Sequence, residues 1–129
     1  MTECEYVLDK SDQYFTSWTY WVSNFYDYPI INVFSRVYPQ STAGIPIRLL
    51  YNSNSKVFIN EYIHDSTIKE LTEIYVPDFL YLNGYLVPVS NLLNYKIDKD
   101  NNLVLVTIDN DWIKKLEVNV MILLKPNEF

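Results

Sequence analysis

His64 is the single histidine of the chain, and histidine is the side chain that most readily exchanges a proton near neutral pH. Asp65 follows it directly, and Cys4, the single cysteine, lies far away near the N-terminus. A nucleophile needs its base within hydrogen-bond distance, and residues adjacent in sequence seldom reach the geometry in which a carboxylate orients an imidazole. The sequence therefore favours a surface histidine at a strand end, and it predicts no Cys-His dyad and no enzymatic activity.

The spacing Asp98-x-Asp100-x-Asn102 matches the start of a calcium-binding loop, with Asp109 at the twelfth position, where a bidentate carboxylate is required. Leu103, however, occupies the position that needs glycine. Asp and Asn also accept local hydrogen bonds in tight turns and tolerate the left-handed backbone conformation. The segment is therefore predicted to be a turn, with no metal site and no cofactor.

Aromatic residues are abundant, with twelve Tyr, six Phe and three Trp. Such side chains favour strands, and they also supply large contact areas with few rotatable bonds. The faces of Trp18, Trp21 and Trp112 can stack on sugar rings while Asp and Asn side chains hold the hydroxyls. A carbohydrate-binding module that uses exposed aromatics is therefore one alternative for the function.

Length, charge and hydropathy exclude several classes of protein. At 129 residues the chain has room for one compact core, and its net charge of -6 argues against nucleic-acid binding, which depends on Lys and Arg. No apolar stretch approaches the ~20 residues of a membrane-spanning helix, and the acidic start, Met1 to Glu5, lacks the features of a secretory signal. We therefore expect no membrane partner and synthesis in a cytoplasm.

The N-terminal third is predicted to form an aromatic helix and a strand. In residues 11–28 the apolar side chains fall at helical spacing, Ser11 or Asp12 can cap the start, and Pro29 stops the helix. Residues 30–38 are rich in β-branched side chains and read as a strand, and residues 39–44 read as a loop.

The remainder is predicted to be mainly strands. Residues 45–51 and 56–63 flank a polar link typical of a hairpin, with Pro46 at an edge, and the spacing of Thr67 and Glu70 predicts a capped helix up to Tyr75. Further expected elements are a hairpin turning at Asn83-Gly84, a second hairpin over 94–98 and 101–106, a helical turn over 109–116 and a central strand over 118–123.

These elements predict a mainly β or α+β fold, namely a small antiparallel β-sandwich or barrel-like domain with an aromatic N-terminal helix. We expect two parts: an aromatic N-terminal helix and strand arm over residues 1–44, and an antiparallel β domain over residues 45–129. No alternation of strands and helices is visible, so a nucleotide-binding parallel sheet is not expected.

The order of Asn83-Gly84, Tyr95-x-Ile97-Asp98 and a closing apolar strand resembles small β-domains of tailed-bacteriophage tail, baseplate and fibre proteins, over residues 76–125. The resemblance implies a non-enzymatic structural or adaptor protein located in the virion. Its implied partners are other virion proteins, in a homo-oligomeric ring or a hetero-assembly. In that role, the N-terminal arm is expected to bind its neighbours through aromatic side chains: Trp18, Tyr20, Trp21 and Phe25.

Overall fold

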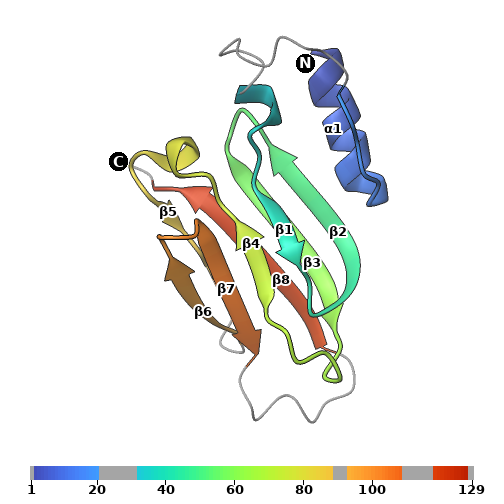
Figure 1. Ribbon diagram of the computed structural model, residues 1–129, viewed down its shortest axis with the longest axis vertical. Helices are drawn as coiled ribbons and strands as arrows, with labels where there is room; N and C mark the ends of the chain where they lie inside the picture. The colour runs from blue at the N-terminus through green and yellow to red at the C-terminus, as the bar shows by residue number, and fades with distance from the viewer. Residues whose placement is uncertain (1, 21–31, 89–92, 109–117, 128–129) are drawn as a thin grey trace.

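Two antiparallel sheets pack face to face in the computed structural model, which describes residues 2–20, 32–88, 93–108 and 118–127. Sheet A has the strand order β1-β4-β7-β6 and sheet B has the order β2-β3-β8-β5. Figure 1 shows sheet A in front of sheet B, with the helix α1 beside the edge strand β2. The predicted antiparallel β-sandwich is confirmed.

The elements follow the chain in a simple order. One α-helix precedes the first strand and a short 3-10 helix, η1, separates β4 from β5. Their bounds are α1 Glu3–Tyr14, β1 Tyr38–Ser41, β2 Gly44–Asn52, β3 Val57–His64, β4 Thr72–Tyr75, η1 Asp78–Tyr81, β5 Tyr85–Leu86, β6 Leu93–Asp98, β7 Leu103–Ile108 and β8 Val118–Pro126. Within the described segments, no helix is both long and apolar enough to cross a membrane.

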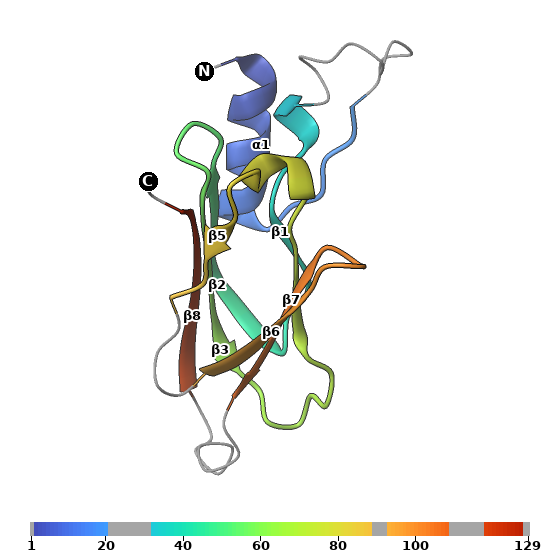
Figure 2. The ribbon, with the colours of Figure 1, turned by 90° about the vertical axis from the view of Figure 1, so that its left-hand side faces the viewer.

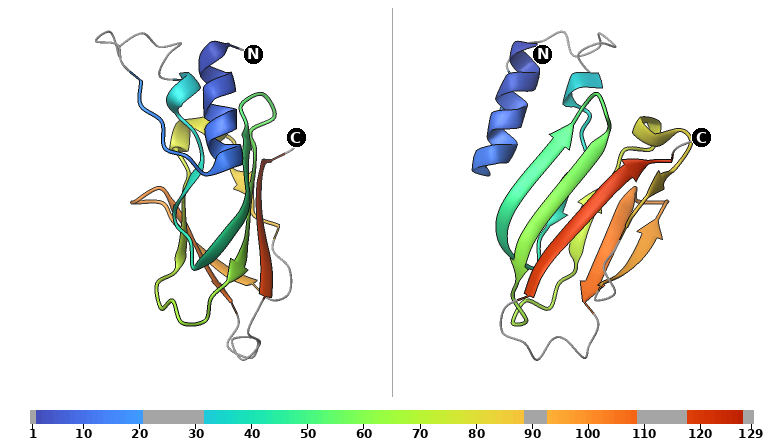
Figure 3. Two further views of the ribbon diagram at one scale, coloured as in Figure 1. Left: turned by 90° about the vertical axis from the view of Figure 1, so that its right-hand side faces the viewer. Right: turned by 180° about the vertical axis from the view of Figure 1, so that it is seen from behind.

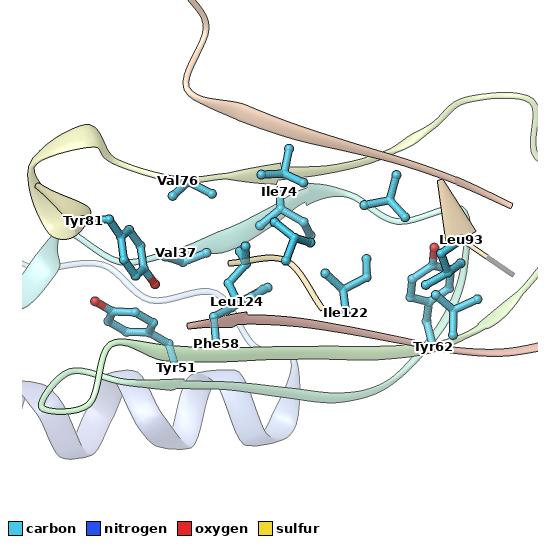
Figure 4. Close-up of a cluster of buried hydrophobic side chains, with 14 of the residues drawn as sticks. Val37, Tyr51, Phe58, Tyr62, Ile74, Val76, Tyr81, Leu93, Ile122 and Leu124 are labelled. Carbon is cyan, nitrogen blue, oxygen red and sulfur yellow. The ribbon is translucent and has the colours of Figure 1, made fainter. Parts of the chain in front are cut away.

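The core lies between the sheets and is filled by alternate residues of the central strands. Phe58 of β3, Ile74 of β4, Val104 of β7 and Ile122 of β8 are completely buried. Figure 4 shows Ile74 from sheet A pointing toward Leu124 and Ile122 from sheet B. This alternation is what a half-buried antiparallel sheet requires, because successive side chains point to opposite faces.

Both hairpins predicted from polar links are confirmed. β2 pairs with β3, and Leu50 lies opposite Ile59, while β6 pairs with β7 over the whole of residues 93–98. Pro46 lies on β2, the edge strand of sheet B, and the pairing register shifts between Pro46 and Arg48. Proline has no N–H to donate, and edge strands and bulges are the positions in a sheet that tolerate this. The closing strand β8 lies between β3 and β5, as expected for a central strand.

The N-terminal helix forms, but in a different place from the prediction over residues 11–28. α1 begins after Thr2, whose hydroxyl accepts from the Glu5 N–H at 3.2 Å while the Glu5 carboxylate accepts from the Thr2 N–H at 2.7 Å. This capping box fixes the start, and the Thr2 N–H holds the pKa of Glu5 below its usual value. The helix ends at Tyr14, because Phe15 is left-handed with φ 52°. Ser11 and Asp12 therefore lie inside the helix and do not cap it.

Two further predicted elements are wrong. Residues 32–34 are helical, and the strand expected over 30–38 begins only at Tyr38. The helix expected from Thr67 to Tyr75 is replaced by a turn, in which the Asp65 carboxylate accepts from Thr67, and by β4. Thr72 is completely buried there; its hydroxyl donates to the Tyr62 hydroxyl at 2.8 Å and accepts from the Ala43 N–H at 2.9 Å. These tertiary bonds outweigh the local helical spacing.

Asn83-Gly84 forms a turn but does not join two paired strands. The preceding residues form η1, and Gly84, with φ 81°, donates its N–H to the Tyr81 carbonyl at 2.8 Å. β5 pairs with the end of β8, where Tyr85 lies opposite Pro126. The hairpin expected here is therefore wrong, although the positive φ at glycine is correct. The helical turn expected over 109–116 lies outside the described residues.

Gly44 is required where β1 leads into β2. A Cβ atom at this position would lie 2.0 Å from the Ile63 carbonyl oxygen, which is fixed backbone. We expect Gly44→Ala to lower the free energy of unfolding by about 1–3 kcal/mol, because the backbone must shift to admit the methyl group. Urea denaturation measures the change, and Gln40→Ala, at an exposed position of β1, is the control that should stay within about 0.5 kcal/mol of the parent. Equal stability of both variants would contradict the prediction.

Candidate functional site

The outer surface of sheet B is unusually apolar. The buried residues of β3 and β8 alternate with residues that point away from the core, and the same holds for the second half of β2. We call this surface the sheet B face and define it by its apolar members: Ile45, Leu50, Ile59, Ile63, Met121 and Leu123.

Cross-strand register brings these side chains together. Leu50 lies opposite Ile59, and Ile59 lies opposite Leu123, which forms one continuous row across three strands. Ile45 and Ile63 form a second row. Between the rows, Glu61 lies opposite both Arg48 and Met121. The face therefore carries two apolar rows with one positive and one negative side chain between them.

Much of this apolar surface is accessible. Ile45 is 64% exposed and Met121 is 56% exposed, and Leu50 is 39% exposed. The right-hand panel of Figure 3 shows sheet B from outside, with α1 lying beside β2; in the part of the chain that the structure describes, no helix lies over the outer face of β3 and β8. Contiguous exposed apolar surface rimmed by polar residues marks an interaction site in a soluble protein.

Arg36 fixes α1 against the sandwich. Its side chain is only 6% exposed, and its Nη2 atom donates to the Asp9 carboxylate at 3.2 Å, to the Asp12 carboxylate and to the Tyr51 carbonyl at 3.2 Å. The guanidinium also lies over the Tyr51 ring, 5.1 Å from its centroid. One buried cation therefore joins α1, the segment before β1, and β2.

The electrostatics of this cluster are those of a structural ion pair. Burial raises the pKa of the Asp12 carboxyl above its usual value, and the Arg36 guanidinium opposes that rise. Burial also raises the pKa of Tyr51 to about 12, so the phenol stays neutral beside the guanidinium. The Asp9 and Asp12 carboxylates both bind the Arg36 guanidinium.

A cleft of about 520 Å³ lies between α1 and β2. Glu5, Asp9 and Asp12 form its helical wall, and residues 47–54 form the other. Glu5 also accepts from the Ser53 hydroxyl at 3.2 Å across the upper end. The cleft is therefore lined by carboxylates that already have partners in the protein.

The predicted partner-binding aromatics are placed in part. Trp18 stacks on Phe34 with ring centroids 5.1 Å apart, and Tyr20 packs on the same ring at 4.7 Å. Trp18 remains 40% exposed. Trp21 and Phe25, like Trp112, belong to segments whose structure is not described. A binding role for these aromatics stays a prediction.

The other residues singled out in the sequence have local roles. His64 Nδ1 lies 3.0 Å from the Ala43 carbonyl oxygen, and Cys4 is a free thiol, half-buried on α1. The Asp98 carboxylate accepts from the Asn101 side chain at 2.9 Å in the β6–β7 turn. The Asn101 side chain accordingly holds the pKa of Asp98 below its usual range. Among the described residues, no group of three or more His, Cys, Asp or Glu is placed to hold a metal ion.

A family profile described as the glycoside hydrolase family 5 C-terminal domain matches residues 36–121, from the anchoring Arg36 to Met121 on the sheet B face. The chain belongs to this family. Family membership identifies the sandwich as the kind of domain that forms the C-terminal part of glycoside hydrolase family 5 enzymes.

One curated relative agrees with this assignment, and two solved structures share the fold. Endoglycoceramidase I of Rhodococcus hoagii is 32% identical over 90 residues, which cover 64% of this chain and 18% of that protein. Endo-glycoceramidase II from Rhodococcus sp. has a similar structure, with a TM-score of 0.74 at 19% identity, over 96% of this chain and 28% of that one. Sterylglucosidase 1 of Cryptococcus neoformans gives a TM-score of 0.58 at 20% identity, over 76% of this chain and 14% of that one. The chain thus spans less than a third of each of these proteins.

These findings correct the expectation of a phage protein. The family match covers residues 36–121, so it includes strands before residue 76 and all but the last four of residues 76–125, and the relatives are glycosidases. The resemblance to phage tail, baseplate and fibre domains is therefore wrong, and so are the virion structural role and the virion location. The motif that carried the resemblance, Asn83-Gly84 followed by Tyr95 to Asp98, does not form the pair of consecutive hairpins that was expected.

Sequence reasoning missed the sheet B face, although a signal was present. Residues 57–63 and 118–124 carry apolar side chains at both odd and even positions. We interpreted that pattern in the closing strand as burial within the sheet. Equally, such a strand can be central in its sheet and still present its second face to a partner outside the chain.

Proposed function

We propose that this chain is a non-catalytic β-sandwich domain of a glycoside hydrolase that acts on lipid-linked glycans. In this role it packs against the catalytic domain through the sheet B face. Family membership supports the association with a glycoside hydrolase. The class of substrate is supported by the names of the relatives, an endoglycoceramidase and a sterylglucosidase, which are enzymes of lipid glycosides.

The observation that carries the proposed contact is the exposure of the sheet B face. Interface centres are enriched in apolar and Met side chains, and the sheet B face carries its two apolar rows with the exposed Met121 between them. The relatives are several times longer than this chain, so each has a large remainder against which such a face can pack. The Arg48 and Glu61 positions between the rows would set the orientation of the two domains.

A non-catalytic role fits the described carboxylates. Glycoside hydrolysis uses two carboxyl groups on opposite sides of the scissile bond, one of them free to deliver a proton. Here Asp9 and Asp12 share one guanidinium, and Asp98 is held by Asn101 in a turn. These groups serve the fold, and the catalytic pair is assigned to the partner domain.

Binding of the purified chain to the family 5 catalytic domain of the same organism tests the proposal, with calorimetry as the readout. We expect Met121→Glu to weaken binding by at least about tenfold, because a second carboxylate would be buried in the interface opposite Glu61. Leu82→Glu is the matched control: Leu82 is 86% exposed, lies in the turn after η1, and should bind like the parent chain. Equal binding by parent and Met121→Glu, or hydrolysis of a glycosylceramide by the chain alone, would overturn the proposal.

A further inference from the structure

A second pocket, of about 370 Å³, lies away from the sheet B face, among η1, the start of β5 and the β6–β7 turn. Figure 2 shows η1 above the gap between β5 and that turn. We call it the η1 pocket; the residues that line it include Asp78, Tyr85, Ile97, Asp98, Lys99, Asn102 and Asn127.

The pocket exists because the sandwich is open on this side. Tyr95 and Ile97 of β6 lie opposite the buried Val106 and Val104, so their side chains are on the core side of sheet A. They nevertheless remain 42% and 38% exposed, since the facing edge strand β5 has only two residues. The accessible Ile97 side chain on this core face forms the apolar floor of the η1 pocket.

An aromatic wall stands beside this floor. The half-buried Tyr85 ring packs on the Tyr81 ring with centroids 5.1 Å apart and planes inclined by 57°. Tyr81 is itself buried, and its hydroxyl donates to the Lys56 carbonyl at 2.6 Å, which fixes the ring. Burial raises the pKa of Tyr85, so its hydroxyl stays protonated at neutral pH. Tyr81 is thus held in place, and the Tyr85 ring packed against it ends in a neutral hydroxyl.

The polar rim is held in place by hydrogen bonds. Asn102, left-handed with φ 58°, accepts from the Val76 N–H at 2.8 Å, and its amide, with the nitrogen toward Asp78, donates to that carboxylate at 3.0 Å. The Asn127 amide nitrogen donates to the Asn83 carbonyl at 2.8 Å. A side chain at Gly84 would meet Asn127, since its Cβ would lie 2.8 Å from Nδ2. Lys99 adds an ammonium group at the turn.

This combination suits a neutral sugar ring. Hydroxyl groups need both donors and acceptors, which the amides, the carboxylate and the phenol supply, while the C–H face of a pyranose needs a flat apolar surface. Two carboxylates, Asp78 and Asp98, stand against one lysine, Lys99, so the lining has no positive excess to attract an anion. The volume lies within the ordinary range for small-molecule pockets. We infer that the η1 pocket binds one neutral hexopyranose unit, stacked on Tyr85 and held by Asn102, Asn127 and Asp78.

Titration of the ¹⁵N-labelled chain with methyl β-glucopyranoside and methyl β-galactopyranoside tests this inference by amide shift changes. We expect saturable shifts at Tyr85, Ile97 and Asn102 for at least one sugar, with a dissociation constant in the range of about 1 mM. Tyr85→Ala should weaken binding at least about tenfold, whereas Tyr38→Ala, at an exposed tyrosine of β1, should leave it unchanged.

Ile97→Trp is a second variant, at an exposed position, that should fill the pocket and block binding while Tyr85 stays in place. A loss of binding in this variant therefore cannot be attributed to misfolding caused by removing the Tyr85 ring. Absence of saturable shifts with either sugar overturns the inference, as do shifts confined to Trp18 and Phe34. The experiment uses this chain alone, so its result is independent of docking through the sheet B face.

Discussion

Arg36→Met is expected to lower the free energy of unfolding by about 3–5 kcal/mol, because removing one partner of a buried ion pair leaves the other charge without compensation. Arg36 is 6% exposed, and Asp12 keeps only 18% of its side-chain surface. The variant also removes the donor to the Tyr51 carbonyl and the cation over the Tyr51 ring. Urea denaturation followed by tryptophan fluorescence measures the change.

Arg48→Met is the matched control for this variant. Arg48 is exposed on β2 and has no ion pair among the described residues, so its replacement should change stability by less than about 0.5 kcal/mol. The double variant Arg36→Met/Asp12→Leu should regain part of the loss, because two apolar side chains can replace a buried ion pair. A free energy of unfolding unchanged by Arg36→Met would show that the cluster does not hold α1.

The elements predictable from sequence were those specified by local turns. The polar links before Val57 and before Leu103 each join strands adjacent in the sheet, so the pairing partner is the next segment of the chain. Asn83-Gly84 has an equally strong local signal, but Leu86 pairs with Lys125, far along the chain. A turn motif specifies the local backbone conformation. It produces a hairpin only where the two flanking segments pair with each other as strands.

The misplaced N-terminal helix and the helix that does not form before Tyr75 both depend on interactions that helical spacing does not show. The aromatic residues from Tyr14 onward have helical spacing but low helix propensity, and the capping box at Thr2 and Glu5 decides where α1 begins. The Thr72 hydroxyl bonds Tyr62 of the preceding strand β3 and Ala43 of the link between β1 and β2, and the local helical spacing around Thr72 shows neither contact. Tertiary hydrogen bonds of this kind favour β4 over a local helix.

The candidate sites were less predictable than the fold. The η1 pocket gathers side chains from Asp78, Tyr85, Ile97 and Asn127, which become neighbours only through the sandwich topology. The strands of the sheet B face have a visible sequence pattern, with apolar residues on both faces. This pattern does not reveal whether the outer face is covered by another part of the same chain or by a partner. The three-dimensional arrangement, with α1 beside β2, shows that no described helix lies over the outer face of β3 and β8.

Neighbouring residues of β3 separate the role of the core from that of the sheet B face. Phe58 is completely buried, and Phe58→Ala is expected to lower the free energy of unfolding by about 3–5 kcal/mol through lost burial and a cavity. Ile59 points outward and is half-buried, so Ile59→Ala should cost the isolated chain about 1 kcal/mol.

Urea denaturation of both variants, alone and bound to the catalytic domain, provides the measurement. In the complex, truncation of Ile59 should weaken binding, because its side chain lies between Leu50 and Leu123 at the centre of one apolar row. Phe58→Ala should instead reduce the folded fraction while the folded molecules bind with parental affinity, since Phe58 faces the interior. Equal losses of stability for the two variants would mean that the outer face is already covered within this chain, which would remove the basis for docking through it.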